Sequence, residues 1–343
     1  SMTESASIHI LYAQLAKEIQ THYAFAKKEY DIPALPEAQC IALPLVREAI
    51  APILVRNNDA DEITDMVLAG HNRVRIIASK TKGVERRRGA QILRALGMGG
   101  RAAANKAFVP KGKKPSDVFD LNSFVFGDSG TGIIGGKEFV FPIHAAVLYS
   151  DAVSVQPKRE IVHSVFRQGG IAEDGGNFDA EDKKSSSNIF TTYAVNPGAL
   201  FVQCLVIPGR RLTRAALEHL LLAVGLTGAY GGATAVTGTN LRTYCAGIYW
   251  GRLERAINAP QEMLKALSDA RDIDAVLVKL QGAFKTTYPQ YIGREETDKS
   301  LMKVIERFEH SDPDLLAQYA AAREQVAALF DAWFLPGSGK DVA

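Results

Sequence analysis

The stretch IFTTYAVNPGALFVQCLVIPG (189–209) determines the expected fold class, because two runs of apolar and β-branched residues are separated and closed by Pro-Gly pairs. Such runs, bounded by turn residues, are typical of strands, here 189–198 and 199–207. A helix over 213–226 should follow, with Thr213 as its N-cap and Leu212 and Leu217 as a hydrophobic staple. Strands followed directly by a helix indicate a fold that contains both.

The chain on either side continues this mixture. We expect 39–58 to be an edge or bulged strand, since Pro44 and Pro52 interrupt its apolar run. Further strands are expected at 74–80, 123–129, 137–150 and 241–251, and helices at 8–30, 85–97 and most of 258–334. The prediction is an α+β protein with a helical N-terminal extension (1–37), a core with insertions (38–257) and a helical C-terminal part (258–343).

The composition limits the function classes. The 343 residues carry 40 Lys and Arg against 38 Asp and Glu, which excludes a histone-like polycation and an acidic disordered chain. No run of about 18 uncharged apolar residues is present, so no membrane partner is expected. The three cysteines, Cys40, Cys204 and Cys245, are far apart in sequence, which is typical of a reducing compartment. We therefore expect a cytoplasmic protein.

The charge is unevenly distributed along the chain. Residues 71–114 contain thirteen Lys and Arg but a single acid, Glu85, so the rest of the chain is net negative. Charge segregated in this way is expected of a surface that binds a polyanion. The alternative is a solvated charged loop, which usually carries interspersed acids that this segment lacks.

The helix ERRRGAQILRALG (85–97) organises this basic segment. Its apolar side chains Ile92 and Leu93 share one face, whereas Arg87 and Arg94 lie on the opposite one. Gly89 is the one weak helix former inside it. The candidate phosphate contacts in and around this helix are Lys80, Lys82, Arg86, Arg87, Arg88, Arg94, Arg101 and Lys106.

A glycine-rich loop, GAYGGATAVTGTN (228–240), is the second candidate binding element. Its backbone N–H groups and small hydroxyls can approach phosphate and ribose closely, with aromatic side chains beside it for stacking. The alternative is a plain glycine turn that lets a helix and a strand pack. The candidate contacts are Gly231, Gly232, Thr234, Thr237, Asn240 and Arg242.

Signals for catalysis are weak. GTGIIG (130–135) matches a dinucleotide-binding glycine pattern, but a strand follows where that site needs a helix, so we expect a hairpin turn. The histidines lack close metal-ligand spacing. We expect no cofactor, metal or catalytic residue. The enzymatic alternative is a metal-dependent ribonuclease that uses Asp59, Asp61 or Asp65.

The segment 167–188 is rich in Gly, acidic residues and Ser, so we expect it to be an exposed, flexible hairpin tip or loop.

The order of these segments resembles a known family. LPLVREAIAPILVRN, RVRIIASKTKG, ERRRGAQILRAL, FVFGDS, the stretch 189–209 and the glycine-rich loop together resemble the CRISPR-associated RAMP-type backbone subunit, most closely its type I-D or type IV branch. The likeness spans about 38–255.

This resemblance implies an RRM-like (ferredoxin-like) βαββαβ core with an inserted thumb hairpin. It implies a non-catalytic subunit that polymerises head to tail along CRISPR guide RNA, together with other subunits of an interference complex, and presents the guide to a target strand. The basic helix matches the family's RNA-facing helix and the glycine-rich loop its RNA-contacting loop. Some branches cleave RNA with a loop aspartate, which has no matching motif here. A generic single-strand binder is the remaining alternative.

Overall fold

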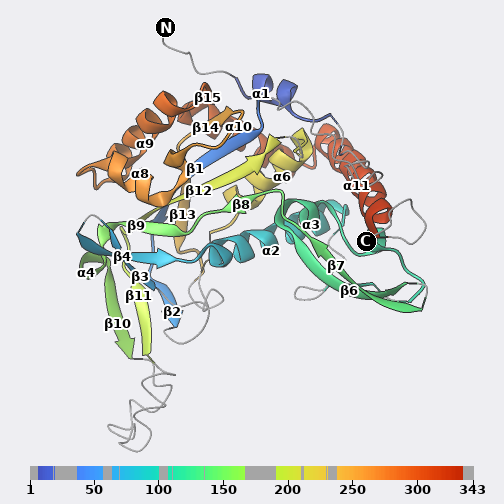
Figure 1. The fold of residues 1–343 in the computed structure, drawn as a ribbon, viewed down its shortest axis with the longest axis horizontal. Coiled ribbons are helices and arrows are strands. Elements are labelled where there is room, and N and C mark those ends of the chain that lie inside the picture. The colour runs from blue at the N-terminus through green and yellow to red at the C-terminus, as the bar shows by residue number, and fades with distance from the viewer. Residues whose placement is uncertain are drawn as a thin grey trace, which may run out of the picture.

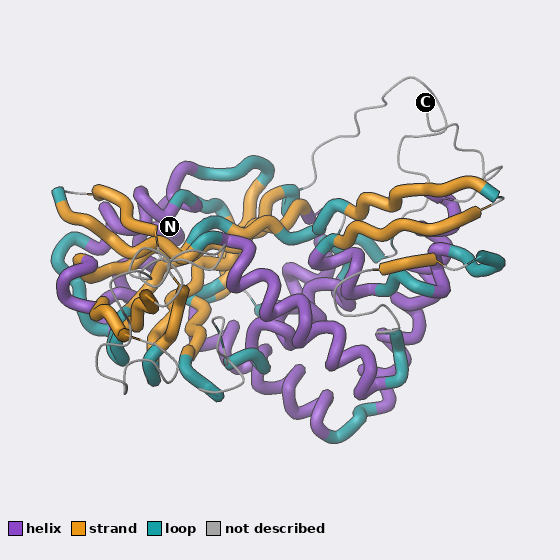
Figure 2. Tube along the Cα trace, turned by 90° about the horizontal axis from the view of Figure 1, so that it is seen from below, coloured by secondary structure: helices purple, strands orange, loops and turns teal. Residues whose placement is uncertain are grey.

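The computed structural model describes most of the chain, and Figure 2 shows the helices, strands and loops of that part. The described residues are 7–17, 19, 37–56, 64–68, 70–99, 107–109, 111–134, 136–166, 191–209, 212–228, 230 and 238–334. The loop predicted at 167–188 lies outside them, as do most of the glycine-rich loop and the acids Asp59 and Asp61.

A nine-stranded antiparallel sheet forms the centre of the molecule (Figure 1). Its order is β15-β14-β1-β12-β9-β4-β3, with β13 also paired to β1 and β8 to β12. The strands are β1 (Cys40–Ala49), β3 (Thr64–Leu68), β4 (His71–Ile76), β8 (Leu148–Tyr149), β9 (Ala152–Pro157), β12 (Leu200–Pro208), β13 (Leu241–Cys245), β14 (Ile248–Gly251) and β15 (Gln290–Ile292).

The expectation that 39–58 forms an edge or bulged strand is wrong for its first half, because β1 lies inside the sheet. One side of β1 pairs with β12 along nearly its whole length. On the other side it pairs first with β14, at residues 40–42, and then with β13, at residues 45–49. Pro44 lies in the gap between these two partners, where the missing N–H breaks no ladder hydrogen bond on that side.

The order of elements along the chain has a simple pattern. α2 (Ala78–Leu96) follows β1 after β2, β3 and β4, and α6 (Arg214–Gly225) directly follows β12. The sequence order of the main elements is β1-α2-β9-β12-α6-β13, and the four strands lie side by side as β13-β1-β12-β9 with every neighbouring pair antiparallel. Within this set of four strands, α2 lies in the chain between β1 and β9, and α6 between β12 and β13, and neither pair of strands is adjacent in the sheet.

Helices cover both faces of this sheet. Alternate side chains of β1, such as Ile41 and Leu43, are buried in one cluster with α2, α6, α3 (Leu121–Phe126) and α11 (Pro313–Phe334). The intervening side chains, such as Ala42 and Val46, are buried in a second cluster with α8 (Pro260–Leu267) and α9 (Ile273–Thr287). The C-terminal part also adds β15 to the sheet, so it shares its core with the strands.

Two small sheets extend from the body, on either side of α2 in Figure 1. One has the order β10-β11-β2 and the other β5-β6-β7. Their strands are β2 (Ile53–Arg56), β5 (Ala107–Val109), β6 (Asp128–Ile134), β7 (Lys137–Ile143), β10 (Val162–Phe166) and β11 (Thr191–Val195). The remaining elements are α1 (Ile8–Gln14), η1 (Pro115–Asp117), α4 (Lys158–Ile161), η4 (Ala256–Asn258) and α10 (Arg294–Glu309).

Several local predictions are confirmed. β11 and β12 lie in the stretch that determined the fold class, and α6 follows it. The Thr213 hydroxyl caps α6 by accepting from the backbone N–H of Ala216 at 3.3 Å. Residues 130–134 of the glycine pattern lie on β6, which pairs with β7 as a hairpin, and Gly136, just before β7, has a positive φ of 81°. A strand follows the pattern, so it forms no helix N-terminus for a dinucleotide.

Other local predictions are wrong. The strand expected at 74–80 ends at Ile76, and α2 takes over at Ala78. The strand expected at 123–129 begins as α3, because the Asp120 carboxylate caps its first turn by accepting from the Ser123 N–H. The strand expected at 241–251 is divided at Gly247, whose φ is 119°.

The helix expected over 8–30 ends at Gln14. The chain continues in an extended conformation at Leu15, and the N–H of Ala16 donates to the carbonyl of Leu212. Leu15 and Ile19 are nevertheless buried in the same cluster as Ile8. The apolar residues with helical spacing are therefore buried as expected, but the backbone beyond Gln14 is not helical.

Candidate nucleic-acid interface

The basic helix α2 is longer than its sequence pattern indicated, since it begins at Ala78 rather than at Glu85. The Asp151 carboxylate accepts a hydrogen bond from the Ala78 N–H at 2.8 Å and so satisfies one free donor of the first turn. The helix ends at Gly97, whose φ of 68° lets the N–H of Met98 return to the Leu93 carbonyl.

Gly89 allows α2 to pack closely against the core. A Cβ atom at this position would lie 2.0 Å from the Asn122 Oδ1 and 3.0 Å from the His219 Nε2. The Asn122 amide group donates to the Arg86 carbonyl at 2.9 Å, and its oxygen lies 2.9 Å from the His219 Nε2. The residue that looked weak in the helix pattern is thus the point where α2 contacts α3 and α6.

The outer side of α2 carries the predicted cations. Arg87 and Arg94 are exposed, and the other described candidates are half-buried, namely Lys80, Lys82, Arg86 and Arg88. Burial and, secondarily, the charge of Arg86 lower the pKa of Lys82. The candidates Arg101 and Lys106 lie outside the described residues.

Arg86 forms an ion pair with a carboxylate of the neighbouring small sheet. Its Nη2 lies 2.8 Å from the Asp128 Oδ1, at the start of β6. The Asp128 side chain is 7% exposed and that of Arg86 36%, so the pair lies at the border between α2 and the small sheet. This cation is only partly available to a ligand.

The single acid of the basic segment points inward. Glu85 is fully buried and forms an ion pair with Arg47 of β1, in which the Arg47 Nη2 donates to the Glu85 Oε1 at 3.1 Å and Nη1 donates to Oε2. Burial alone would lower the pKa of Arg47, but the charge of Glu85 raises it above its usual value. The ion pair therefore links α2 to β1, a central strand of the sheet.

Neutral groups complete this buried pair. The Tyr149 hydroxyl donates to the Glu85 Oε1 at 2.6 Å, and the Tyr230 hydroxyl donates to Oε2. The Arg47 Nε donates to the Gln203 Oε1 at 3.0 Å. Burial and the Glu85 charge raise the pKa of both tyrosines, so both hydroxyls stay protonated as donors. The charged pair is therefore hydrogen-bonded on several sides, as burial of charge requires.

The glycine-rich loop is held at its two ends. The Tyr230 N–H donates to the Asn240 Oδ1 at 2.9 Å, and the Asn240 amide returns a hydrogen bond to the Tyr230 carbonyl at 2.7 Å. Asn240 is fully buried, so its side chain closes the base of the loop rather than facing a ligand. Arg242, the next candidate along the chain, is exposed on β13. Gly231, Gly232, Thr234 and Thr237 lie outside the described residues.

This network was not predicted, although a signal for it was present. A lone acid within thirteen cations can serve as the partner of a buried arginine, but Arg47 is distant in sequence and lies in a run that was interpreted only as an extended, mainly apolar strand. Tyr230 is one of the aromatic residues expected from the sequence to serve as stacking partners, but in the structure its hydroxyl donates to Glu85. Through Tyr230 and Glu85, the two candidate binding elements are joined to each other.

The enzymatic alternative gains no support from the described residues. Among them, no three His, Cys, Asp or Glu side chains cluster in a way that could hold a metal ion. Asp65 lies on β3, while Asp59 and Asp61 fall outside the described part. In the same part of the chain, no helix combines the length and apolar character needed to cross a bilayer.

A profile of the Csc2 CRISPR family matches residues 24–326, which is most of the chain. The chain belongs to this family. It is therefore a CRISPR-associated RAMP-type subunit and a component of a CRISPR interference complex, as the order of its sequence segments predicted.

One solved structure supports this assignment at the level of the fold. The crystal structure of Thermofilum pendens Csc2 superposes with a TM-score of 0.61 at 14% identity, covering 94% of each chain. Chains of a type IV-B CRISPR complex and of a CRISPR RNA-guided surveillance complex match with TM-scores of 0.39 and 0.35, at 15% identity each. They cover 67% and 83% of this chain and 100% and 98% of their own. A comparison with curated proteins found no match.

Proposed function

We propose that this chain is the non-catalytic backbone subunit that binds CRISPR guide RNA in its interference complex, through the outer side of α2 and the adjoining glycine-rich loop. The observation that carries this proposal is the position of Glu85. Because the one acid of α2 is buried against Arg47, the cations of the helix face outward without an acid of their own helix among them. Such a face suits a phosphate backbone.

The core is proposed to be RRM-like. The chain order β1-α2-β9-β12-α6-β13 and the spatial order β13-β1-β12-β9 support this proposal, since a βαββαβ unit of this class places its fourth strand beside the first and its third between the first and second. RRM domains commonly stack bases on the open face of the sheet. Here α8 and α9 cover that face, so the RNA is expected to follow α2 and the loops instead.

Binding should therefore depend on phosphates more than on base identity. The test measures the affinity for labelled single-stranded RNA as a function of salt concentration, in the parent and in an Arg87→Ala, Arg94→Ala double variant. Each lost phosphate contact on a single strand lowers the slope of log affinity against log salt by about 0.7. We expect a loss of about 1.4 in the double variant and no change in Arg323→Ala, an exposed arginine of α11. An unchanged slope in the double variant would contradict the proposal.

The identity of the RNA needs a separate measurement. A guide-RNA subunit should copurify with a discrete RNA that carries repeat-derived ends, whereas a generic single-strand binder should copurify with heterogeneous RNA.

Incubation of labelled RNA with Mg²⁺ tests the ribonuclease alternative. Cleavage that disappears on Asp59→Ala, Asp61→Ala or Asp65→Ala substitution would favour the enzyme.

Assembly along the RNA follows from the same charge distribution. Outside 71–114 the chain is net negative, so the basic face of one copy can meet an acidic surface of the next in a head-to-tail contact. Such heterologous contacts produce open filaments, and these would present the guide to the target strand. Sedimentation with RNAs of increasing length should show complexes that grow with RNA length. A single protein-to-RNA ratio at every length would contradict polymerisation.

A further inference from the structure

A second pair of arginines converges on one backbone carbonyl at the far edge of the main sheet. Arg73 of β4 and Arg271, in the connection between α8 and α9, both donate through Nη1 to the carbonyl oxygen of Val155, Arg271 at 3.2 Å. Arg73 is 7% exposed, whereas Arg271 is exposed. Neither forms an ion pair within the part of the chain that the structure describes.

A bulge in β9 creates this arrangement. Arg75 of β4 is in register with Val153, but Arg73 is in register with Pro157, so β9 contains extra residues between these positions. The Ser154 hydroxyl accepts the hydrogen bond of the Val74 N–H that the ladder would otherwise satisfy. The Val155 carbonyl is thereby released from pairing with β4 and accepts the two arginines instead. Bulges of this kind often redirect groups toward a binding site.

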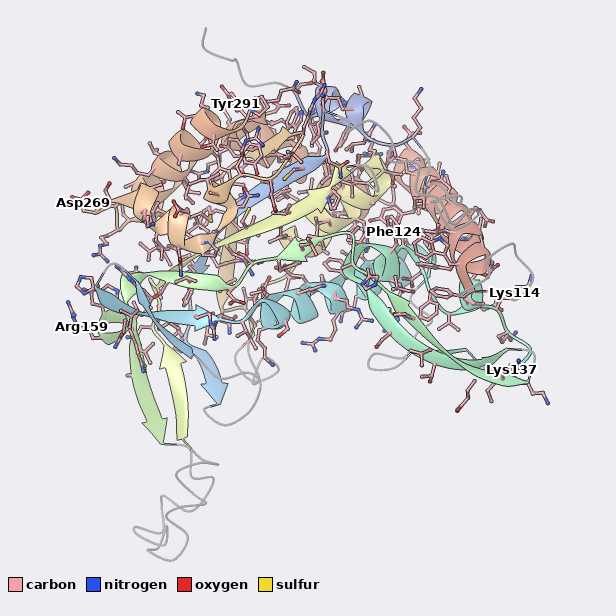
Figure 3. All side chains as sticks on the ribbon, in the orientation of Figure 1. Lys114, Phe124, Lys137, Arg159, Asp269 and Tyr291 are labelled. Atoms are coloured by element: carbon pink, nitrogen blue, oxygen red, sulfur yellow. The ribbon has the colours of Figure 1, made fainter. Side chains whose placement is uncertain are left out.

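The position of this pair differs from that of α2. Val74 packs into the cluster that contains Val84 of α2, so its neighbour Arg73 points to the opposite face of the sheet. Arg271 comes from the helical layer on that opposite face. Arg159, on the adjoining helix α4, also lies at this edge of the molecule (Figure 3).

The two guanidinium groups that share the Val155 carbonyl have further N–H donors with which they could bind an anion. The Arg73 Nε is buried and has no hydrogen-bond partner among the described residues, and the two guanidinium groups repel each other. Burial, followed by the charge of Arg271, lowers the pKa of Arg73, and the nearby Glu160 only partly opposes this effect. An anion placed between the two groups would relieve the repulsion and engage their free N–H donors.

We propose that Arg73 and Arg271 form a second phosphate-binding site, which holds a phosphate group of the bound nucleic acid on the side of the sheet opposite α2. A phosphate group suits this pair better than a carboxylate. One guanidinium fork can saturate the two oxygens of a carboxylate, whereas a tetrahedral phosphate offers oxygens to two forks that approach from different elements. This inference rests on the proposed RNA-binding function.

The test removes the exposed partner. Arg271→Gln should lower the affinity for single-stranded RNA several-fold at low salt and reduce the salt slope by about 0.7, the value for one phosphate contact. Its effect should add to that of Arg87→Ala, because the two sites are separate. Arg323→Gln, which removes the same charge from α11, should change neither quantity. Arg73→Lys keeps the buried charge but loses the fork, and it should reproduce the loss of affinity.

The outcomes separate this inference from the proposed function. If RNA binds and the α2 double variant weakens it while Arg271→Gln does not, the second site is overturned and the proposed function stands. If the α2 double variant has no effect either, the proposed function itself fails.

Two further measurements identify other ligands for the same pair. Inorganic phosphate, compared with chloride at equal ionic strength, should raise the melting temperature of the parent but not of Arg271→Gln. A phosphate effect without any change in RNA binding would mean that the site takes the free ion, and it would overturn the proposal. A change in self-association without a change in RNA binding would assign the pair to a carboxylate of a second copy, with the same consequence.

Discussion

Glu85 of α2 and Arg47 of β1 form a fully buried ion pair that links the proposed RNA-binding helix to a central strand of the sheet. Removing one partner from such a pair leaves the other charge buried and unpaired, which costs about 3–5 kcal/mol. The same carboxylate accepts hydrogen bonds from Tyr149 and Tyr230. Two of the three groups that bond it, Arg47 and Tyr149, belong to the sheet, and the third, Tyr230, lies at the start of the glycine-rich loop.

The two tyrosines provide a matched pair of variants. Tyr149→Phe and Tyr230→Phe each remove one hydroxyl from the same buried carboxylate, so each should lower the free energy of unfolding by about 1.5–3 kcal/mol. Only Tyr230 leads into the glycine-rich loop, so only Tyr230→Phe should also weaken RNA binding in a fluorescence anisotropy titration. Equal RNA affinities in the two variants would show that Glu85 does not position the loop.

Gly89 and Gly83 should respond in opposite directions to the same substitution. Gly89→Ala places a Cβ atom 2.0 Å from the Asn122 Oδ1 and should destabilise the protein by about 1–3 kcal/mol. At Gly83, in the same helix, a Cβ atom would meet no other atom within 4 Å, so Gly83→Ala should stabilise the protein by up to about 1 kcal/mol. Urea denaturation measures both values, and a neutral or stabilising Gly89→Ala would show that α2 can move away from α3.

The ion pair between Arg86 and Asp128 restrains one of the proposed RNA contacts. Asp128→Asn should release Arg86 and raise the affinity for RNA by up to about fivefold, the equivalent of a partly exposed ion pair of about 1 kcal/mol. Asp274→Asn is the control, because it removes an acid beside Arg294 in the C-terminal helical layer. A lower affinity in Asp128→Asn would mean that Asp128 positions Arg86 for binding instead of competing with RNA.

The lowered pKa of the buried His219 predicts how the free energy of unfolding depends on pH. Complete burial lowers its pKa from 6.5 to about 3, and its neutral ring bridges Asn122 and Tyr319 through contacts of 2.9 Å each. The unfolded chain therefore binds a proton on this residue between pH 6.5 and 3 that the folded chain does not. Its contribution to stability is complete above pH 6.5 and falls by about 1.4 kcal/mol per pH unit well inside that window.

Subtracting a variant isolates this effect from other titrating groups. The difference in unfolding free energy between the parent and His219→Gln should shrink as the pH falls from 6.5 toward 3, because glutamine does not titrate. A difference that stays constant across this range would contradict a neutral, buried His219.

Local sequence patterns were enough to predict the class of the fold and the segment that carries the basic surface. Runs of β-branched residues ending in Pro-Gly formed β11 and β12, and helical periodicity placed Ile92 and Leu93 inward and Arg87 and Arg94 outward. These features depend on neighbours within a few residues, which periodicity and turn chemistry report directly.

Contacts between residues that are distant in the chain became known from the three-dimensional fold alone. Arg47 and Tyr230 lie far from Glu85 in sequence, and no local pattern pairs them, yet packing of α2 on β1 brings all three together. The same holds for Arg73 and Arg271, which a bulge in β9 and the layer of C-terminal helices join at one carbonyl. Long-range contacts of this kind follow from the order of strands in the sheet, which composition and periodicity do not encode.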